Sequence, residues 1–316
     1  MTAILKIATT SLATLEDVSP PFNLRHPEPA ETLALGLSLL DAAGAQSADL
    51  AVLPETFEAA GLPGRRLAEV AQPLDGPGIS AVADRARRHR MNVVAGFFVR
   101  DGNRITNRAL LFDRDGNITG SYAKRYPTSG EIANGVEPGL SSGVFDSDIG
   151  RVGLAVCFDL NWSGMWAEMK AQGADLVCWL SAYEGGLPLQ SYAWTYQYPI
   201  ISSVWPYHAK LVEKTGRVTG TTSRWSRLGL FELNLDKRLF HTDGHMHKLV
   251  PMLERYGAAV RIESFTEEHW FTLESRDPAL PVGEVIAAFG LVEYADFVAE
   301  CEAALAAHQR KSSGTE

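Results

Sequence analysis

The feature that most constrains the fold of this 316-residue chain is an alternation of short apolar segments with stretches of helical periodicity. Residues 4–8, 49–53 and 92–99 are apolar runs of strand length. Between them, residues 31–46 and 77–90 place apolar side chains at helical spacing. A strand, helix, strand, helix, strand order of this kind is typical of a layered α/β domain.

Antiparallel pairs join this alternation. Residues 108–112 and 118–122 flank an Asp-Gly turn of the kind that hairpins use. Residues 209–213 and 217–222 form a second candidate pair around a Lys-Thr-Gly sequence. The chain therefore predicts a mixed α/β architecture.

The net charge of −9 argues against a nucleic-acid-binding surface, since phosphate binding needs concentrated lysine and arginine. No apolar run approaches the length of a membrane span, so no membrane association is expected. The three cysteines, Cys157, Cys178 and Cys301, have widely unequal spacings and fit neither a disulfide framework nor a paired metal motif. This cysteine pattern favours a reducing compartment, and we expect a cytoplasmic protein.

The candidate chemistry begins at Cys157, where the apolar run of residues 152–156 ends. Such a cysteine would lie at the carboxyl end of a strand, the edge of an α/β sheet where ligands bind. Glu55 and Lys124 follow two other candidate strands. If these strands lie in one layered sheet with a common edge, a carboxylate, an ammonium and a thiol converge in one pocket.

Chemically the three residues complement one another. A free thiol has a pKa of about 8.5 and needs a base or a nearby cation to become a nucleophile. Glu55 could take the proton of Cys157, and Lys124 could stabilise the thiolate and then the oxyanion formed by its attack. The backbone N–H of Phe158 could be a second oxyanion donor.

Three segments together resemble the nitrilase, or carbon–nitrogen hydrolase, superfamily, whose hallmark is a Glu-Lys-Cys triad in this order. They are Leu53-Pro54-Glu55, residues 124–131 and residues 153–159. The resemblance extends from the first strand to about residue 240 and implies a four-layer α-β-β-α sandwich over residues 1–240. It also implies a homodimer or larger homo-oligomer, and no cofactor is expected.

By the same resemblance Glu55 is the general base, Lys124 the oxyanion-stabilising residue and Cys157 the nucleophile. Glu131 matches a second glutamate of many members, which would position the amine part of the substrate or assist proton transfer. The implied reaction is attack of the thiol on a carbon–nitrogen carbon, release of ammonia or an amine, and hydrolysis of the thioester.

The sequence after the nucleophile, Cys157-Phe158-Asp159, is similar to the amidase and N-carbamoyl amide hydrolase branches, whereas nitrile-hydrolysing members carry Cys-Trp-Glu. Residues expected to contact the substrate are Trp162, Ser181, Ala182 and Tyr183, although Trp162 could equally be a packing aromatic. Amide, N-carbamoyl and nitrile substrates remain open at this point. So do acyl transfer with the same triad and a catalytically silent binding or assembly module.

Residues 241–316 match the family poorly and are interpreted as a C-terminal extension that packs on the domain or on a partner subunit. Helical patterns cover residues 247–256 and 293–307. His241, His245 and His247 suggest zinc by composition, but a spacing of two residues between the last two is wrong for one helical face. We therefore expect no metal site.

Overall fold

A computed structural model describes residues 4–13, 18–19, 23–24, 28–60, 62 and 64–312. The chain divides into two compact units, one of residues 5–233 and one that begins at Asn234 and also includes Ile4. The boundary expected between residues 240 and 241 falls inside strand β15 (Arg238–His241). This strand belongs to the second unit because it pairs with β17 (Trp270–Ser275).

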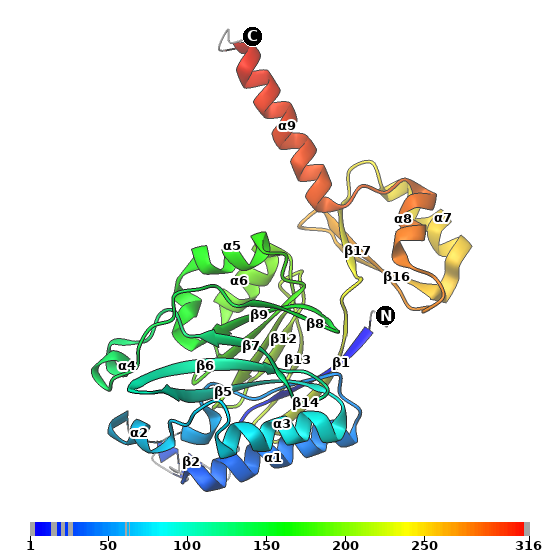
Figure 1. The fold of residues 1–316 in the computed structure, drawn as a ribbon. Coiled ribbons are helices and arrows are strands. Elements are labelled where there is room, and N and C mark those ends of the chain that lie inside the picture. Colours follow the sequence, from blue (N-terminus) through cyan, green and yellow to red (C-terminus); the bar gives the residue numbers. More distant parts are fainter. Residues whose placement is uncertain are drawn as a thin grey trace. The chain divides into compact units, whose positions relative to one another are not determined.

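The first unit contains two six-stranded sheets (Figure 1). In order, the first sheet consists of β14 (Leu228–Asn234), β1 (Ile4–Thr10), β4 (Leu50–Val52), β5 (Asn92–Asp101), β6 (Arg104–Phe112) and β7 (Ile118–Ala123). The second consists of β13 (Val218–Thr221), β12 (Lys210–Val212), β11 (Ile200–Val204), β10 (Leu176–Ser181), β9 (Gly150–Val156) and β8 (Val144–Ser147). Two short strands, β2 (Val18–Ser19) and β3 (Asn23–Leu24), pair separately.

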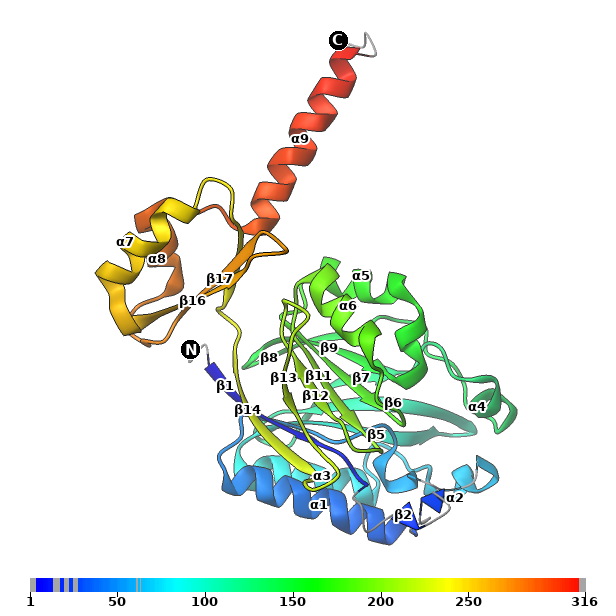
Figure 2. The same ribbon diagram turned by 180° about the vertical axis from the view of Figure 1, so that it is seen from behind.

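Helices cover the outer faces of both sheets (Figures 1 and 2). On the first sheet lie α1 (Pro29–Ala45) and α3 (Pro77–His89), and on the second lie α5 (Ser163–Ala171) and α6 (Leu187–Tyr196). Shorter helical segments are η2 (Phe57–Ala59), η3 (Gly64–Arg66), α2 (Leu67–Val70), α4 (Ser129–Ala133) and η4 (Cys157–Asn161). The expected four-layer sandwich is confirmed.

Both sheets have parallel strands at their centre. In the first sheet β4 pairs in parallel with β1 and β5, and in the second β10 pairs in parallel with β9 and β11. Every residue of β10 is buried because helices cover one face of the sheet and the other sheet covers the opposite face. This arrangement explains why β4 and β10 read as continuous apolar runs.

The second unit has its own core. Its antiparallel sheet has the order β15, β17, β16 (Val260–Phe265), and the helices α7 (Met246–Tyr256) and α8 (Val282–Phe289) contribute to the same apolar cluster. A short segment, η5 (Gly257–Ala259), follows α7, and α9 (Tyr294–Ser312) is the last helix. The helical patterns expected at residues 247–256 and 293–307 are confirmed, whereas packing of the extension on the domain or a partner stays a prediction.

Across the described ranges, no helix is both long enough and apolar enough to cross a bilayer.

A buried carboxyl group connects three segments of the first unit near the candidate site. Glu58 of η2 is 6% exposed, and its Oε1 accepts a hydrogen bond of 2.6 Å from the Gln72 side chain. The Oε1 of Gln72 in turn accepts from the backbone N–H groups of Gly78 and Ile79 at the start of α3, at 2.9 and 3.3 Å. Burial raises the pKa of Glu58 from 4.5 to about 7, and the hydrogen bond from Gln72 opposes this shift.

We predict that Glu58→Gln removes a pH dependence from the folding stability. Because the folded-state pKa of Glu58 is raised, the contribution of this group to the free energy of unfolding is full below pH 4.5, falls as the pH rises from 4.5 to 7, and stays reduced above 7. The free energy of unfolding of the variant relative to that of the wild type should therefore rise by about 3 kcal/mol as the pH increases across this window. Urea unfolding at several pH values measures the difference, and Glu69→Gln, at an exposed position, is the control that should show no such trend. A pH-independent difference for Glu58→Gln would contradict the prediction.

Candidate active site

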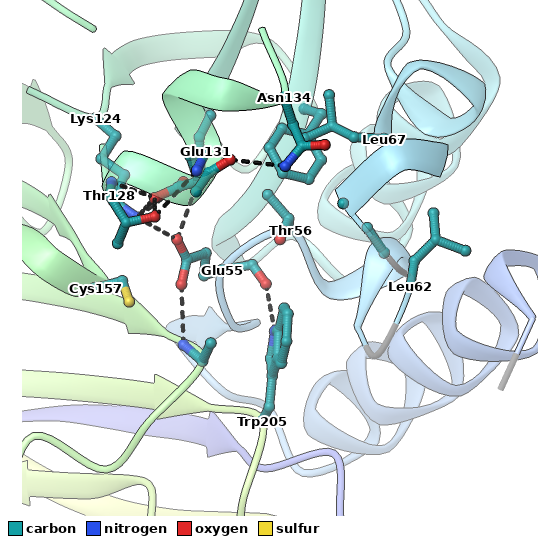
Figure 3. A pocket seen from close by; sticks show the side chains of 16 residues that line it. Glu55, Thr56, Leu62, Leu67, Lys124, Thr128, Glu131, Asn134, Cys157 and Trp205 are labelled. Carbon is teal, nitrogen blue, oxygen red and sulfur yellow. Dashed lines mark hydrogen bonds and ion pairs between the residues drawn. The ribbon is translucent and has the colours of Figure 1, made fainter. Parts of the chain in front are cut away.

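Glu55, Lys124 and Cys157 converge in one cavity, to which each contributes lining atoms (Figure 3). Glu55 follows β4 and Lys124 follows β7, both in the first sheet, while Cys157 follows β9 in the second. The expectation of one sheet with a common edge is therefore wrong. The residues meet because the two sheets lie face to face and present the ends of these strands at the same place.

Lys124 is 1% exposed and lies between two carboxylates. Its Nζ donates to Glu55 Oε1 at 2.8 Å and to Glu131 Oε2 and Oε1 at 2.7 and 2.9 Å. Burial alone would lower the pKa of Lys124, but the negative charges of Glu55 and Glu131 outweigh it and raise the pKa above its ordinary value. The lysine is therefore an ammonium ion at any physiological pH.

Glu131 reaches Lys124 from the first turn of α4. Its Oε2 also accepts from the backbone N–H and the hydroxyl of Thr128, at 2.8 and 3.0 Å, while Thr128 Oγ1 accepts from the Glu131 N–H. This reciprocal arrangement is the capping box that a Thr-x-x-Glu sequence favours. Burial raises the pKa of Glu131, but the Lys124 charge and hydrogen bonds outweigh it, so the pKa is lowered and the side chain is a carboxylate.

Asn107 is a member of this cluster that sequence reasoning missed. Its Nδ2 donates to Glu55 Oε1 at 2.7 Å and to Glu131 Oε1 at 2.9 Å. The amide orientation follows from these contacts, because a carbonyl oxygen could not face two carboxylates. The Lys124 N–H donates to the Asn107 carbonyl at 2.8 Å, so the β6–β7 pairing places both residues together. Extending the expected hairpin of residues 108–122 by one pair would have found Asn107.

Cys157 lies in a strained backbone conformation at the end of β9. Its φ of 47° is in the left-handed region, which is uncommon for residues other than glycine. The carbonyl of Cys157 accepts from the Trp179 indole N–H at 3.1 Å. Thr56, directly after Glu55, also has a positive φ, of 37°. Strain of this kind persists where the surroundings hold the backbone firmly, which is common at functional sites.

Asp159 holds the turn that contains Cys157. Its carboxylate accepts from the backbone N–H of Val156 at 2.9 Å, from the hydroxyl of Tyr122 at 2.8 Å and from the backbone N–H of Tyr126 at 3.0 Å. Burial raises the pKa of Asp159 to about 6, while these hydrogen bonds oppose the shift. Since Tyr122 and Tyr126 flank the Lys124 segment, Asp159 fixes the position of the nucleophile relative to the lysine.

The thiol of Cys157 is protonated in the resting site. Burial and the negative charge of Glu55 raise its pKa, and the Lys124 charge and hydrogen bonds with the Ala182 backbone and the Ser181 side chain only partly oppose the rise. A nearby base is therefore required before the sulfur can attack a substrate.

Glycine at position 96 allows β5 to pass close to Glu55. A Cβ atom on Gly96 would lie 2.5 Å from the Thr56 nitrogen, 2.6 Å from the Pro54 oxygen and 2.7 Å from the Glu55 Cα. All three contacts are with backbone, which cannot move aside without displacing Glu55. Any side chain at this position would thus disturb the candidate base.

The cavity has a volume of about 280 Å³. Its polar and charged wall comes from the triad, Glu131, Asn107 and Thr128, and Trp205 lies beside Glu55 with its indole N–H donating to the Glu55 carbonyl at 2.6 Å. The remaining lining residues are Thr56, Ala59, Leu62, Gly64, Leu67, Phe98, Gly130, Asn134 and Ala182.

The expected substrate-contacting residues divide into two groups. Ala182 lines the cavity, and its N–H donates to Glu55 Oε2 at 3.0 Å. Trp162, Ser181 and Tyr183 are not among the lining residues. Trp162 stacks on the Tyr126 ring, with centroids 4.1 Å apart, as the alternative packing interpretation expects.

Ser181 and Phe158, two further residues expected at the site, differ in their exposure. Ser181 is fully buried and accepts from the Tyr183 N–H at 3.0 Å. The Phe158 side chain is 37% exposed and contacts Trp162 edge-on, while its backbone N–H directly follows Cys157 in η4. Its role as an oxyanion donor stays a prediction.

The histidines considered for zinc lie in the second unit. His241 stacks on Phe297 at 4.7 Å, and His245 Nε2 accepts from the Val292 N–H at 3.2 Å, while His247 is exposed. The expectation of no metal stays a prediction.

Comparison with known proteins identifies the class. The model of the carbon-nitrogen hydrolase family matches residues 17–235, and the chain belongs to this family. The membership in the nitrilase superfamily expected from the triad motifs is confirmed.

Individual relatives are distant. The chain is 29% identical over 167 residues to a bifunctional nitrilase/nitrile hydratase of Nicotiana tabacum, covering 46% of this chain and 48% of that protein. It is 30% identical over 119 residues to a deaminated glutathione amidase of Yersinia enterocolitica, covering 34% and 42%. These matches thus span about half or less of the length of either relative.

Two solved structures share the fold. Nit3 of Saccharomyces cerevisiae, a member of branch 10 of the nitrilase superfamily, is 17% identical with a TM-score of 0.63, covering 73% of this chain and 90% of that chain. A mutant of the amidase from Nesterenkonia sp. AN1 in complex with butyramide is 21% identical with a TM-score of 0.64, covering 73% and 91%.

We predict that Asn107 positions Glu55 and Glu131 through its shared NH₂ group. Asn107→Leu removes two hydrogen bonds to carboxylates and should lower kcat by roughly 10- to 100-fold. Asn107→Asp adds a third carboxylate, which should raise the pKa of the acidic groups around it and move the acid limb of the kcat/KM profile to higher pH.

The pH dependence of Cys157 alkylation by iodoacetamide, followed by peptide mass spectrometry, is a second readout that needs no substrate. Thermal unfolding of each variant controls for folding. A purely structural role would lower activity without moving either pH profile, and that result would contradict the prediction.

Proposed function

We propose that the chain hydrolyses the carbon–nitrogen bond of a non-peptide amide or N-carbamoyl compound through a thioester on Cys157, releasing ammonia or an amine. The observation that carries this proposal is the buried Glu55–Lys124–Glu131 cluster in the same cavity as a protonated thiol. The family membership and the amidases among the similar proteins support it.

In the first step Glu55 takes the proton of the Cys157 thiol, and the thiolate attacks the carbonyl carbon. The proton transfer moves a negative charge from a carboxylate to a sulfur within the same cavity. Lys124 favours the resulting thiolate because its ammonium lowers the pKa of the thiol.

In the second step the tetrahedral oxyanion is stabilised and collapses. Lys124 acts mainly through its charge, since its N–H groups already donate to Glu55 and Glu131, and the Phe158 N–H is the proposed hydrogen-bond donor. Protonated Glu55 gives its proton to the leaving nitrogen, so ammonia or an amine departs and Cys157 carries the acyl group as a thioester.

In the last step water replaces the amine. Glu55 deprotonates the water, which attacks the thioester carbon, and the sulfur recovers a proton as the acid leaves. Glu131 holds Lys124 throughout, because its two oxygens are occupied by Lys124, Asn107 and Thr128. Its proposed role is thus positioning rather than contact with the amine.

Two alternative activities would use the same catalytic residues, and a third alternative is a protein without catalytic activity. Nitrile hydrolysis also passes through a Cys157 thioester and releases ammonia, and acyl transfer replaces water by another nucleophile. A catalytically silent binding or assembly module would have no need for a desolvated Glu–Lys–Glu cluster beside a thiol, so this cluster disfavours that alternative. A cytoplasmic homodimer or larger homo-oligomer without cofactor completes the proposal.

We predict that Cys157→Ala abolishes ammonia release from amides, N-carbamoyl compounds and nitriles. Loss of a nucleophile lowers kcat by roughly 10⁴- to 10⁶-fold. Wild-type protein quenched during turnover should carry an acyl mass adduct on the peptide that contains Cys157, and Glu55→Gln should suppress its formation.

Cys301→Ser is the matched control, since this cysteine is exposed and lies outside the cavity. Added hydroxylamine distinguishes transfer from hydrolysis by the fraction of hydroxamate formed. If no substrate of the three classes yields ammonia or a Cys157 adduct, the enzymatic proposal is wrong.

A further inference from the structure

One side of the cavity wall is apolar. Ala59 of η2, Leu62, Leu67 of α2 and Phe98 of β5 line it together. Figure 3 shows Leu62 and Leu67 on the side opposite Cys157, with Glu55 between. An acyl group attached to the sulfur would extend toward this apolar wall, where burial of methylene groups is favourable.

The charged side chains of the cavity already pair with one another. Among the lining residues that the structure describes, the charged ones are Glu55, Glu131 and Lys124. Lys124 donates to both carboxylates, so two negative charges and one positive charge leave a net negative charge on the cluster. None of the described lining side chains offers a second cation to a carboxylate on the substrate.

We infer that the substrates are primary amides of small, uncharged, mainly aliphatic acids, and that acyl groups or carbamoyl compounds bearing a carboxylate are excluded. A carboxylate entering this cavity would lose its hydration without gaining a cationic partner, and it would be repelled by the net negative cluster. The cavity volume of about 280 Å³ lies near the lower end of the range of ligand pockets and favours small substrates. The inference rests on the proposed function and selects among the substrates that it leaves open.

A substitution at Asn134 should weaken this selectivity. Asn134 lines the cavity, is exposed, and donates from Nδ2 to the Gly130 carbonyl at 2.7 Å. It ends α4 as the C-cap residue. A lysine here would place a cation at the cavity without burying it, so folding should be preserved.

The test compares matched pairs in which a terminal methyl group is exchanged for a carboxylate. Pentanamide is paired with glutaramate, and propylurea with N-carbamoyl-β-alanine. For the wild type, kcat/KM of pentanamide should exceed that of glutaramate by about 100-fold or more, since an unpaired buried charge is strongly disfavoured. The kcat/KM of propylurea should likewise exceed that of N-carbamoyl-β-alanine.

Asn134→Lys should raise the ratio of kcat/KM for glutaramate to kcat/KM for pentanamide by about 10-fold, and this gain should fall as salt is added. Asn134→Gln is the matched neutral control, and it should not raise this ratio. Equal or faster turnover of the charged members by the wild type, with a Cys157 adduct present, would overturn the inference and leave the proposed function standing. Absence of turnover and of any Cys157 adduct with all four compounds would overturn both.

Discussion

The site depends on the burial of the Lys124 ammonium. An ion that is 1% exposed loses several kcal/mol of hydration, and this loss is tolerated only when opposite charges and further hydrogen bonds surround it. Glu55 and Glu131 supply the charges. Asn107 and Thr128 donate further hydrogen bonds to these carboxylates, and the Ala182 N–H donates to Glu55 Oε2. The ends of β4 and β7, the strand β6 and the helix α4 are therefore held together by one electrostatic requirement.

A second requirement fixes the nucleophile against this cluster. Asp159 accepts from the backbone N–H of Val156 in a buried hydrogen bond and from that of Tyr126 in a partly buried one. The strained φ of Cys157 accompanies a sharp turn at the end of β9, where Asp159 holds the Val156 N–H and Trp179 holds the Cys157 carbonyl. Within the Cys157-Phe158-Asp159 sequence, Asp159 thus serves to hold the backbone around Cys157, and it does not itself line the cavity.

The sequence predicted those parts of the fold and site that depend on local pattern. Apolar periodicity located α1 and α3 within two residues, and strand ends located Glu55, Lys124 and Cys157. It did not predict β11, a short run after Pro199 that pairs with β10 on one side and β12 on the other.

Long-range contacts account for the remaining differences. Asn107 was missed because its role arises from pairing across a hairpin and from two carboxylates distant in sequence. Trp162 was expected at the substrate from the Asn161-Trp162 sequence, with packing as the alternative. It stacks on Tyr126 and is not among the residues that line the cavity, and its contact with a substrate stays a prediction. The sheet of the second unit escaped prediction because β15 pairs with β17 across more than one intervening element.

In the proposed mechanism, activation of the Cys157 thiol and the choice of substrate both depend on the same charge distribution. When Glu55 takes the thiol proton, a thiolate replaces a carboxylate, so the net charge of the buried site does not change and no new ion must be desolvated. Burial and the negative charge of Glu55 raise the pKa of the Cys157 thiol, so the sulfur stays protonated until a base takes its proton. A carboxylate on the acyl group would add a second net negative charge to this site, at the step where the oxyanion must also form beside Lys124. Under the proposed function, selectivity for uncharged acyl groups and activation of the thiol would therefore share one cause, the net negative charge of the Glu55–Lys124–Glu131 cluster.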